Sequence, residues 1–144
     1  MLLGSQALVN DPYRDNVVLH LRGYDAQSGQ SFKDYSKYNR TITANGNVAH
    51  STAQNKYGNS SIYFDGNGDY LIDPASSDFN FGTGDFTIEA WVKINQFTLL
   101  TICSLWHPTY GYSFNVIYNN SNSKFGFGVN GIFYYLSNTM TDSN

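Results

Sequence analysis

The stretch from Tyr112 to Val129, YSFNVIYNNSNSKFGFGV, predicts two strands and the turn that joins them. Aromatic or aliphatic side chains occupy every second position of residues 112–118, and residues 125–129 repeat this spacing with glycines between them. Successive side chains of a strand point to opposite faces, so a period of two places one apolar set on one face of a sheet. The polar run NNSNS, residues 119–123, is typical of a turn.

The same alternation recurs along the rest of the chain, and helical periodicity is nearly absent. Further strands are predicted at residues 16–21, 40–44, 47–52, 60–66, 69–73, 86–94, 99–106 and 132–137. The dipeptides Asn45-Gly46 and Asn130-Gly131 tolerate positive φ and predict short hairpin turns. Segment 86–94 alternates cleanly and predicts a half-buried strand, whereas the apolar run 99–106 predicts a strand with both faces covered.

The composition indicates one β-rich domain and argues against two classes of partner. The chain has 144 residues, of which 13% are charged and 17% are aromatic. This length is typical of a single domain, and aromatic side chains pack well on pleated surfaces. The net charge is −3 and the eight basic residues are scattered along the sequence, which argues against nucleic acid. No segment has the roughly 20 apolar residues that span a membrane, and the first residues lack a secretory signal pattern.

Three motifs carry a resemblance to a known family: DYS at residues 34–36, KYGNSSIYFDGNGDYL at 56–71 and DFTIEAWV at 85–92. From about residue 11 to residue 144 the chain resembles the laminin-G-like, concanavalin-A-like jelly-roll domain, most closely the versions found in phage and marine viral structural proteins. The resemblance implies an all-β fold, an antiparallel β-sandwich of two sheets. Residues 1–15 would be a lead-in arm and residues 16–144 the jelly-roll domain.

In that family the pattern continues with further strands after the point that corresponds to residue 144. The last strands of the jelly roll are therefore expected either in a longer chain, which is the favoured interpretation, or from a partner. A half sandwich would leave unpaired strand edges and an uncovered apolar face.

The loop DGNGD places Asp65, Asn67 and Asp69 at the spacing of a calcium-binding loop. Tyr70 and Ser76 stand where an EF-hand requires glycine and an acidic residue, which excludes an EF-hand. The favoured interpretation is a glycine-rich hairpin turn whose Asp and Asn side chains bond their own backbone, and calcium is the alternative. No other cofactor is predicted.

The sequence shows no catalytic constellation, so the chain is predicted not to be an enzyme. Glu89 is the only Glu, and Thr87 and Trp91 occupy the positions where glucanases that resemble this fold carry a second acid. Cys103 is expected to be a buried structural thiol. Its spacing from His107 gives no reason to expect a nucleophile and its base.

Aromatic side chains near predicted loops suggest a carbohydrate site, because a ring can stack on the apolar face of a pyranose. The candidates are Trp91, on the polar face of its strand, and a cluster made of Trp106, His107, Tyr110 and Tyr112. The alternative role for each of them is packing between sheets or against a neighbouring subunit.

These features predict a non-enzymatic structural or binding module of a virion, either a capsid decoration or a tail or fibre component. The expected partners are other virion proteins, further copies of the chain in a homo-oligomer, and host glycans, with no nucleic acid and no membrane. The alternative is a carbohydrate-binding lectin module of a larger secreted or surface protein, which would be extracellular. A fragment of a sugar-active enzyme is a third interpretation.

Overall fold

The computed structural model describes residues 12–24, 29–96, 98–107, 111–129 and 132–137. Over these ranges the chain forms antiparallel strands and two 3-10 helices, η1 (Arg14–Asn16) and η2 (Ser77–Phe79), with no α-helix. The all-β class is thereby confirmed, and the antiparallel sheets are consistent with a β-sandwich. Within these ranges there is no apolar helix of membrane-spanning length. The chain divides into two compact units, Met1–Ile88 and Glu89–Asn144.

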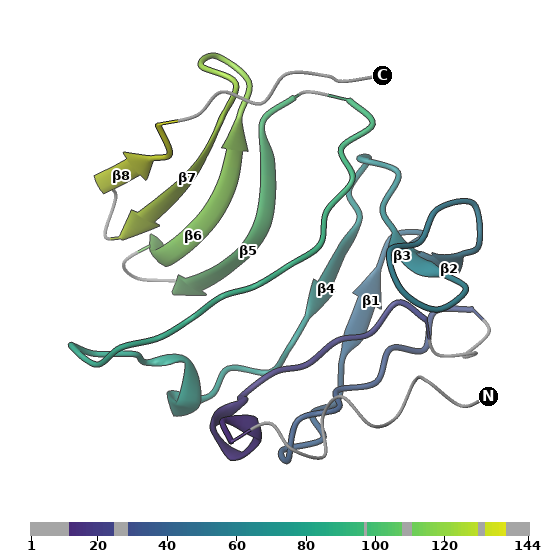
Figure 1. Ribbon diagram of the computed structural model, residues 1–144, viewed down its shortest axis with the longest axis horizontal. Coiled ribbons are helices and arrows are strands. Elements are labelled where there is room, and N and C mark those ends of the chain that lie inside the picture. The colour runs from purple at the N-terminus through teal and green to yellow at the C-terminus, as the bar shows by residue number, and fades with distance from the viewer. Residues whose placement is uncertain (1–11, 25–28, 97, 108–110, 130–131, 138–144) are drawn as a thin grey trace. The chain divides into compact units, whose positions relative to one another are not determined.

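The first unit contains two short strand pairs (Figure 1). β1 (Thr43–Asn45) pairs with β4 (Tyr70–Ile72), and β2 (Ala49–Ser51) pairs with β3 (Ser61–Tyr63). The second pairing is nested inside the first, so both follow one long hairpin, which residues 46–48 and 64–69 interrupt. The four strands predicted between residues 40 and 73 are therefore present in shortened form.

The prediction that Asn45-Gly46 closes a hairpin between its flanking strands is wrong. Gly46 has a positive φ of 77°, but β1 and β2 on either side of it pair with different strands. The Asn47 N–H donates to Asp69 Oδ1 at 2.8 Å, and a Cβ on Gly46 would lie 2.2 Å from the same oxygen. A side chain thus accepts the backbone hydrogen bond that a continued strand ladder would use.

The strand predicted at residues 16–21 does not form. Helix η1 occupies its start, and the segment makes only an isolated antiparallel bridge, between Leu21 and Asp34. The His20 N–H donates to the Asp34 carboxylate at 3.0 Å. This partly buried backbone donor is satisfied by a side chain in place of a neighbouring strand.

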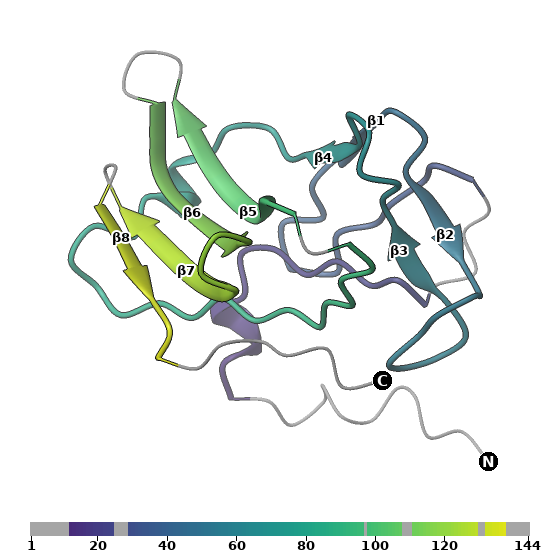
Figure 2. The ribbon, with the colours of Figure 1, turned by 90° about the horizontal axis from the view of Figure 1, so that it is seen from above.

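The second unit contains one four-stranded antiparallel sheet in the order β5-β6-β7-β8 (Figure 1 and Figure 2). The strands are β5 (Leu100–His107), β6 (Gly111–Asn119), β7 (Lys124–Val129) and β8 (Ile132–Tyr135). They confirm the strands predicted between residues 99 and 137, and the turn at 119–123 is also confirmed. The predicted turn at Asn130-Gly131 lies outside the described residues.

Glycines in β7 make room for aromatic rings of β8. Gly126 pairs with Tyr135 and Gly128 pairs with Phe133, and the two rings stack with their centroids 6.2 Å apart. A Cβ on Gly128 would lie 2.3 Å from Asn115 Oδ1 and 2.8 Å from the Phe133 ring. The alternating glycines of KFGFGV are therefore a packing requirement of this sheet.

The strand predicted at residues 86–94 does not form, and its apolar side chains are not half-buried as expected. No described strand pairs with this segment, and Phe86 and Val92 are 44% and 48% exposed. A strand requires a hydrogen-bonded neighbour, which alternation within one segment cannot supply. The expectation that both faces of residues 99–106 are covered is also wrong, because Thr101 and Ser104 are exposed.

Candidate functional site

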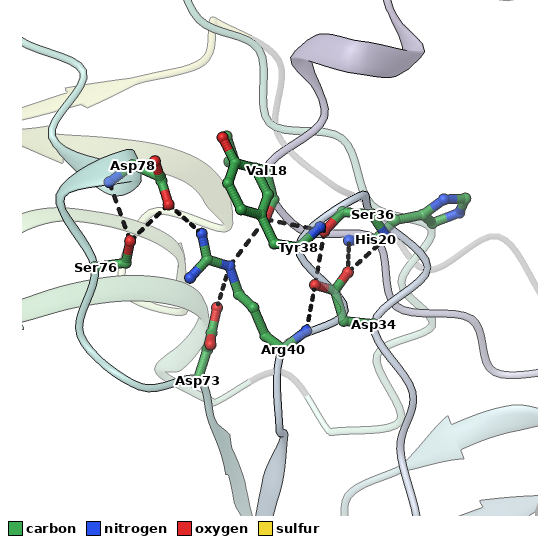
Figure 3. Close-up of polar contacts among 9 residues, drawn as sticks. All are labelled: Val18, His20, Asp34, Ser36, Tyr38, Arg40, Asp73, Ser76 and Asp78. Carbon is green, nitrogen blue, oxygen red and sulfur yellow. Dashed lines mark hydrogen bonds and ion pairs between the residues drawn. The ribbon is translucent and has the colours of Figure 1, made fainter.

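Asp34 organises the loops of the first unit around its buried carboxylate (Figure 3). The residue is 1% exposed, and its oxygens accept hydrogen bonds from the N–H groups of His20, Ser36 and Arg40 and from the Ser36 hydroxyl. Burial opposes ionisation, but these four hydrogen bonds outweigh it and hold the pKa of the carboxyl below its ordinary value. The DYS motif thereby joins the segment that ends near His20 to the segment that leads to Arg40.

Arg40 extends this network to helix η2 (Figure 3). Its guanidinium pairs with Asp78, and its Nε lies 3.2 Å from the Val18 carbonyl oxygen and 3.5 Å from Asp73 Oδ2. Neither Asp73 oxygen has a hydrogen-bond donor among the described residues. Burial raises the pKa of Asp73, although the charge of Arg40 acts in the opposite direction. Hydrogen bonds from Ser76 and Arg40 lower the pKa of Asp78.

A cavity of about 300 Å³ lies next to this network, within the first unit. Its lining comes from helix η1, from the segment that follows it, and from the residues directly after Asp34. The lining residues are Arg14, Asp15, Val17, His20, Arg22, Tyr35, Ser36 and Lys37. This volume is at the lower end of the range of small-molecule sites, roughly 300–1,000 Å³. We call this cavity the basic pocket.

Among the described residues that line the basic pocket, three carry a basic Arg or Lys side chain and one, Asp15, carries a carboxylate, so positive charge predominates in this part of the lining. The guanidinium carbon of Arg22 lies 4.3 Å from the ring centroid of Tyr35 and 5.7 Å from that of Tyr24. Lys33 Nζ lies 4.9 Å from the same Tyr35 centroid. These cation–π contacts orient Arg22 without neutralising its charge.

The DGNGD loop interrupts the long hairpin and does not close one, so the hairpin part of that prediction is wrong. Asp65 accepts hydrogen bonds from the Asn67 N–H at 2.7 Å and from the Asn47 amide at 3.0 Å. Asp69 accepts from the N–H groups of Asp65 and Asn47, each at 2.8 Å. The hydrogen bonds from Asn67 and Asn47 lower the pKa of Asp65. Both carboxylates thus bond backbone groups, as the turn interpretation predicts.

Calcium binding by Asp65, Asn67 and Asp69 stays a prediction. Among the residues whose placement is described, no group of three or more His, Cys, Asp or Glu side chains is arranged to hold a metal ion. The amide oxygen of Asn67 would have to complete a site that the two carboxylates begin.

The predicted carbohydrate residues belong to the second unit, and their grouping stays a prediction. Trp91 is 71% exposed and lies in the segment that forms no strand. Trp106 and His107 lie in β5 and Tyr112 lies in β6, but their side chains are outside the described part of the structure. Tyr110 is also outside the described residues.

Two residues with reactive side chains have structural surroundings. Cys103 is half-buried in β5, and burial raises the pKa of its thiol, which disfavours the nucleophilic thiolate. The ring nitrogens of His50 lie 3.0 Å from the Gly23 carbonyl oxygen and 3.1 Å from that of Ser31, and the ring stacks on Phe32. His50 therefore joins loops of the first unit.

The sequence analysis missed the basic pocket, because basic residues that are scattered along the sequence come together in space. The sequence contains one indication of this pocket. Five of the eight basic residues fall between residues 14 and 40: Arg14, Arg22, Lys33, Lys37 and Arg40. Their irregular spacing matches neither a helix face nor a strand face, so periodicity alone does not bring them together.

Comparisons with protein-family models, with curated proteins and with solved structures found no match for this chain. The geometry of the first unit is therefore the basis for a functional proposal.

Proposed function

We propose that this chain is a non-enzymatic module of a viral particle that binds glycans through the basic pocket. The proposal includes jelly-roll topology, homo-oligomeric assembly and contact with other virion proteins, all of which rest on the resemblance seen in the sequence. One observation supports the binding function directly. The pocket of about 300 Å³ has a polar lining that Asp34 and the ring of Tyr35 hold in place.

The lining favours recognition over hydrolysis. Glycoside hydrolysis uses two carboxyl groups across the scissile bond, whereas Asp15 is the one carboxylate among the lining residues that the structure describes. Arg14, Arg22 and Lys37 contribute hydrogen-bond donors, which hydroxyl oxygens of a sugar can accept.

Repetition on a particle would compensate for the small size of the pocket. A cavity for one small ligand has few contacts, so a single copy is expected to bind weakly. Many copies on one particle act together, because each binding event raises the effective concentration of the ligand for the next copy. Weak sites of this kind suit attachment to a glycan-covered surface.

A glycan array tests the binding function. We expect the unmodified chain to bind a subset of glycans, and Lys37→Gln to lose most of this signal. Lys37 is exposed, so the substitution is expected to leave the fold intact. Trp91→Ala should retain binding. A blank array for the unmodified chain, or loss of binding in Trp91→Ala with retention in Lys37→Gln, would contradict the assignment to the basic pocket.

The lectin alternative, a module of a larger secreted or surface protein, would use the same pocket. Mass spectrometry of purified virus particles separates the two locations. We expect peptides of this chain in the particles at a constant ratio to the major capsid protein. Their absence from purified particles, together with glycan binding by the chain, would favour the lectin module.

A further inference from the structure

We infer that the basic pocket binds an anionic sugar unit, one that carries a carboxylate, sulfate or phosphate group near Arg14, Arg22 and Lys37. This inference rests on the proposed glycan binding and adds the chemical class of the ligand. It depends on three features of the pocket: its charge, the fixed position of Arg22, and its size.

The charge of the pocket is opposite to that of the chain. The net charge is −3, yet the described lining of the pocket holds three basic side chains and one carboxylate, that of Asp15. The ion pairs between described residues are those of Arg40 with Asp73 and Asp78, and neither of them involves a lining residue of the basic pocket. Basic groups that outnumber the carboxylates beside them repel one another, and a bound anion would relieve this repulsion.

Arg22 is held in place before a ligand arrives. Arg22 lies over the rings of Tyr35 and Tyr24, and its Nε lies 3.5 Å from His20 Nε2. The Tyr35 N–H donates to the His20 carbonyl at 2.8 Å, which links two segments of the lining. A site that is already ordered loses little conformational freedom on binding. A guanidinium presents paired N–H donors that match the oxygens of a carboxylate or phosphate.

The size of the pocket restricts the ligand to a small group. A volume of about 300 Å³ suits one sugar unit, whereas a polyanion such as nucleic acid would require an extended basic groove. Lys56, which belongs to the same unit, is not among the described lining residues, so it does not extend the pocket into such a groove.

Matched sugars test this inference on the isotope-labelled full chain by NMR titration. The probes are glucose, glucuronate, glucose 6-sulfate and glucose 6-phosphate, which differ only in the group at carbon 6, outside the ring. We expect at least one acidic sugar, but not glucose, to shift the amide signals of Arg22, Tyr35 and Lys37. Lys37→Gln should weaken this binding about tenfold, the effect of one charge-assisted hydrogen bond. Lys124→Gln removes the same charge outside the pocket and should bind like the unmodified chain.

The outcomes separate the anionic ligand from glycan binding in general. The three acidic sugars distinguish a carboxylate, a sulfate ester and a phosphate ester as the natural group. Equal binding of glucose and the acidic sugars would overturn the inference that the ligand is anionic, but it would not contradict the proposal that the basic pocket binds glycans. If inorganic sulfate or phosphate shifts the same signals while no sugar does, both proposals are overturned. Unchanged affinity in both Lys37→Gln and Arg22→Gln would also overturn the inference, because the ligand would then bind elsewhere.

Discussion

Asp34 is a buried carboxylate that is ionised because the backbone surrounds it with donors. Burial ordinarily disfavours the ionised form of a carboxyl group, and Asp34 is only 1% exposed. Its four hydrogen bonds nevertheless lower its pKa. Asp73 is the contrasting residue of the same network. Its oxygens accept no hydrogen bond from a described donor, and burial raises its pKa. The number of hydrogen-bond donors around each carboxylate therefore decides the direction of its shift.

The substitution Asp34→Asn is expected to lower the free energy of unfolding by about 3 kcal/mol. An amide places an N–H₂ group where the carboxylate now accepts from Arg40, and it leaves that partly buried backbone donor unsatisfied. Urea unfolding of both proteins measures the difference. Asp85→Asn, at an exposed position, is the control and should change stability little.

The same variant has an expected pH dependence. The folded pKa of Asp34 lies below its unfolded value of about 3.9, so its contribution is complete above that pH. The contribution is lost as the pH falls through the folded pKa. The unmodified protein should therefore lose more stability on acidification than Asp34→Asn does. Parallel stability curves for the two proteins would show that the carboxylate is not preferentially ionised in the folded state.

At the scale of elements, the sheet of the second unit depends on glycines that lie against aromatic rings. We expect Gly128→Ala to destabilise the protein by about 1–3 kcal/mol, because its Cβ would overlap Asn115 Oδ1 and the Phe133 ring. Gly84→Ala is the matched control, since its Cβ would lie 3.5 Å from the Phe81 carbonyl oxygen, an ordinary contact. Thermal unfolding of both variants measures the effect. Equal unfolding temperatures would refute the packing role of Gly128.

The DGNGD loop is the element for which a metal and a turn are competing interpretations. The carboxylates of Asp65 and Asp69 already accept hydrogen bonds from backbone N–H groups, so the loop needs no cation to hold its shape. We therefore expect the same unfolding temperature in calcium and in chelator. A ligand that binds only the folded state raises the unfolding temperature. A clear increase in calcium, absent in Asp69→Asn, would establish the metal site instead.

At the scale of the whole molecule, β8 supports the proposed homo-oligomer. It is the last strand in the described order of its sheet, its sequence IFYY has neither charge nor proline, and Ile132 and Tyr134 are 61% and 64% exposed. Edge strands without charge or proline are prone to pair with another chain. We expect two copies to associate through β8.

Sedimentation measures this association, and Tyr134→Lys should shift the protein towards monomer because a charge on the edge opposes pairing. Thr98→Lys adds the same charge at an exposed position outside the strands and should leave association unchanged. If the unmodified chain is a monomer at every concentration, or if Tyr134→Lys associates equally well, β8 is not the interface.

The sequence by itself determined the all-β class and the strands of residues 99–137. Alternation, glycines and the polar run NNSNS are local features, and in the second unit each strand pairs with its neighbour in sequence. Local sequence features are sufficient to predict strands where each strand also pairs with a neighbour that is close in sequence. The same reasoning found the short strands of the first unit but assigned the wrong hairpin to Asn45-Gly46.

Only the tertiary structure decided the pairing of β1 with β4, the absence of a strand at residues 86–94, and the basic pocket. Each of these depends on residues that are distant in the chain. Asp69 ends the ladder beside Gly46, and Asp34 brings the segment of Arg22 next to that of Lys37. Side-chain hydrogen bonds across such distances follow no sequence period. The physical reason is that a periodic pattern specifies which face of a segment is apolar, but it does not specify which partner that segment meets.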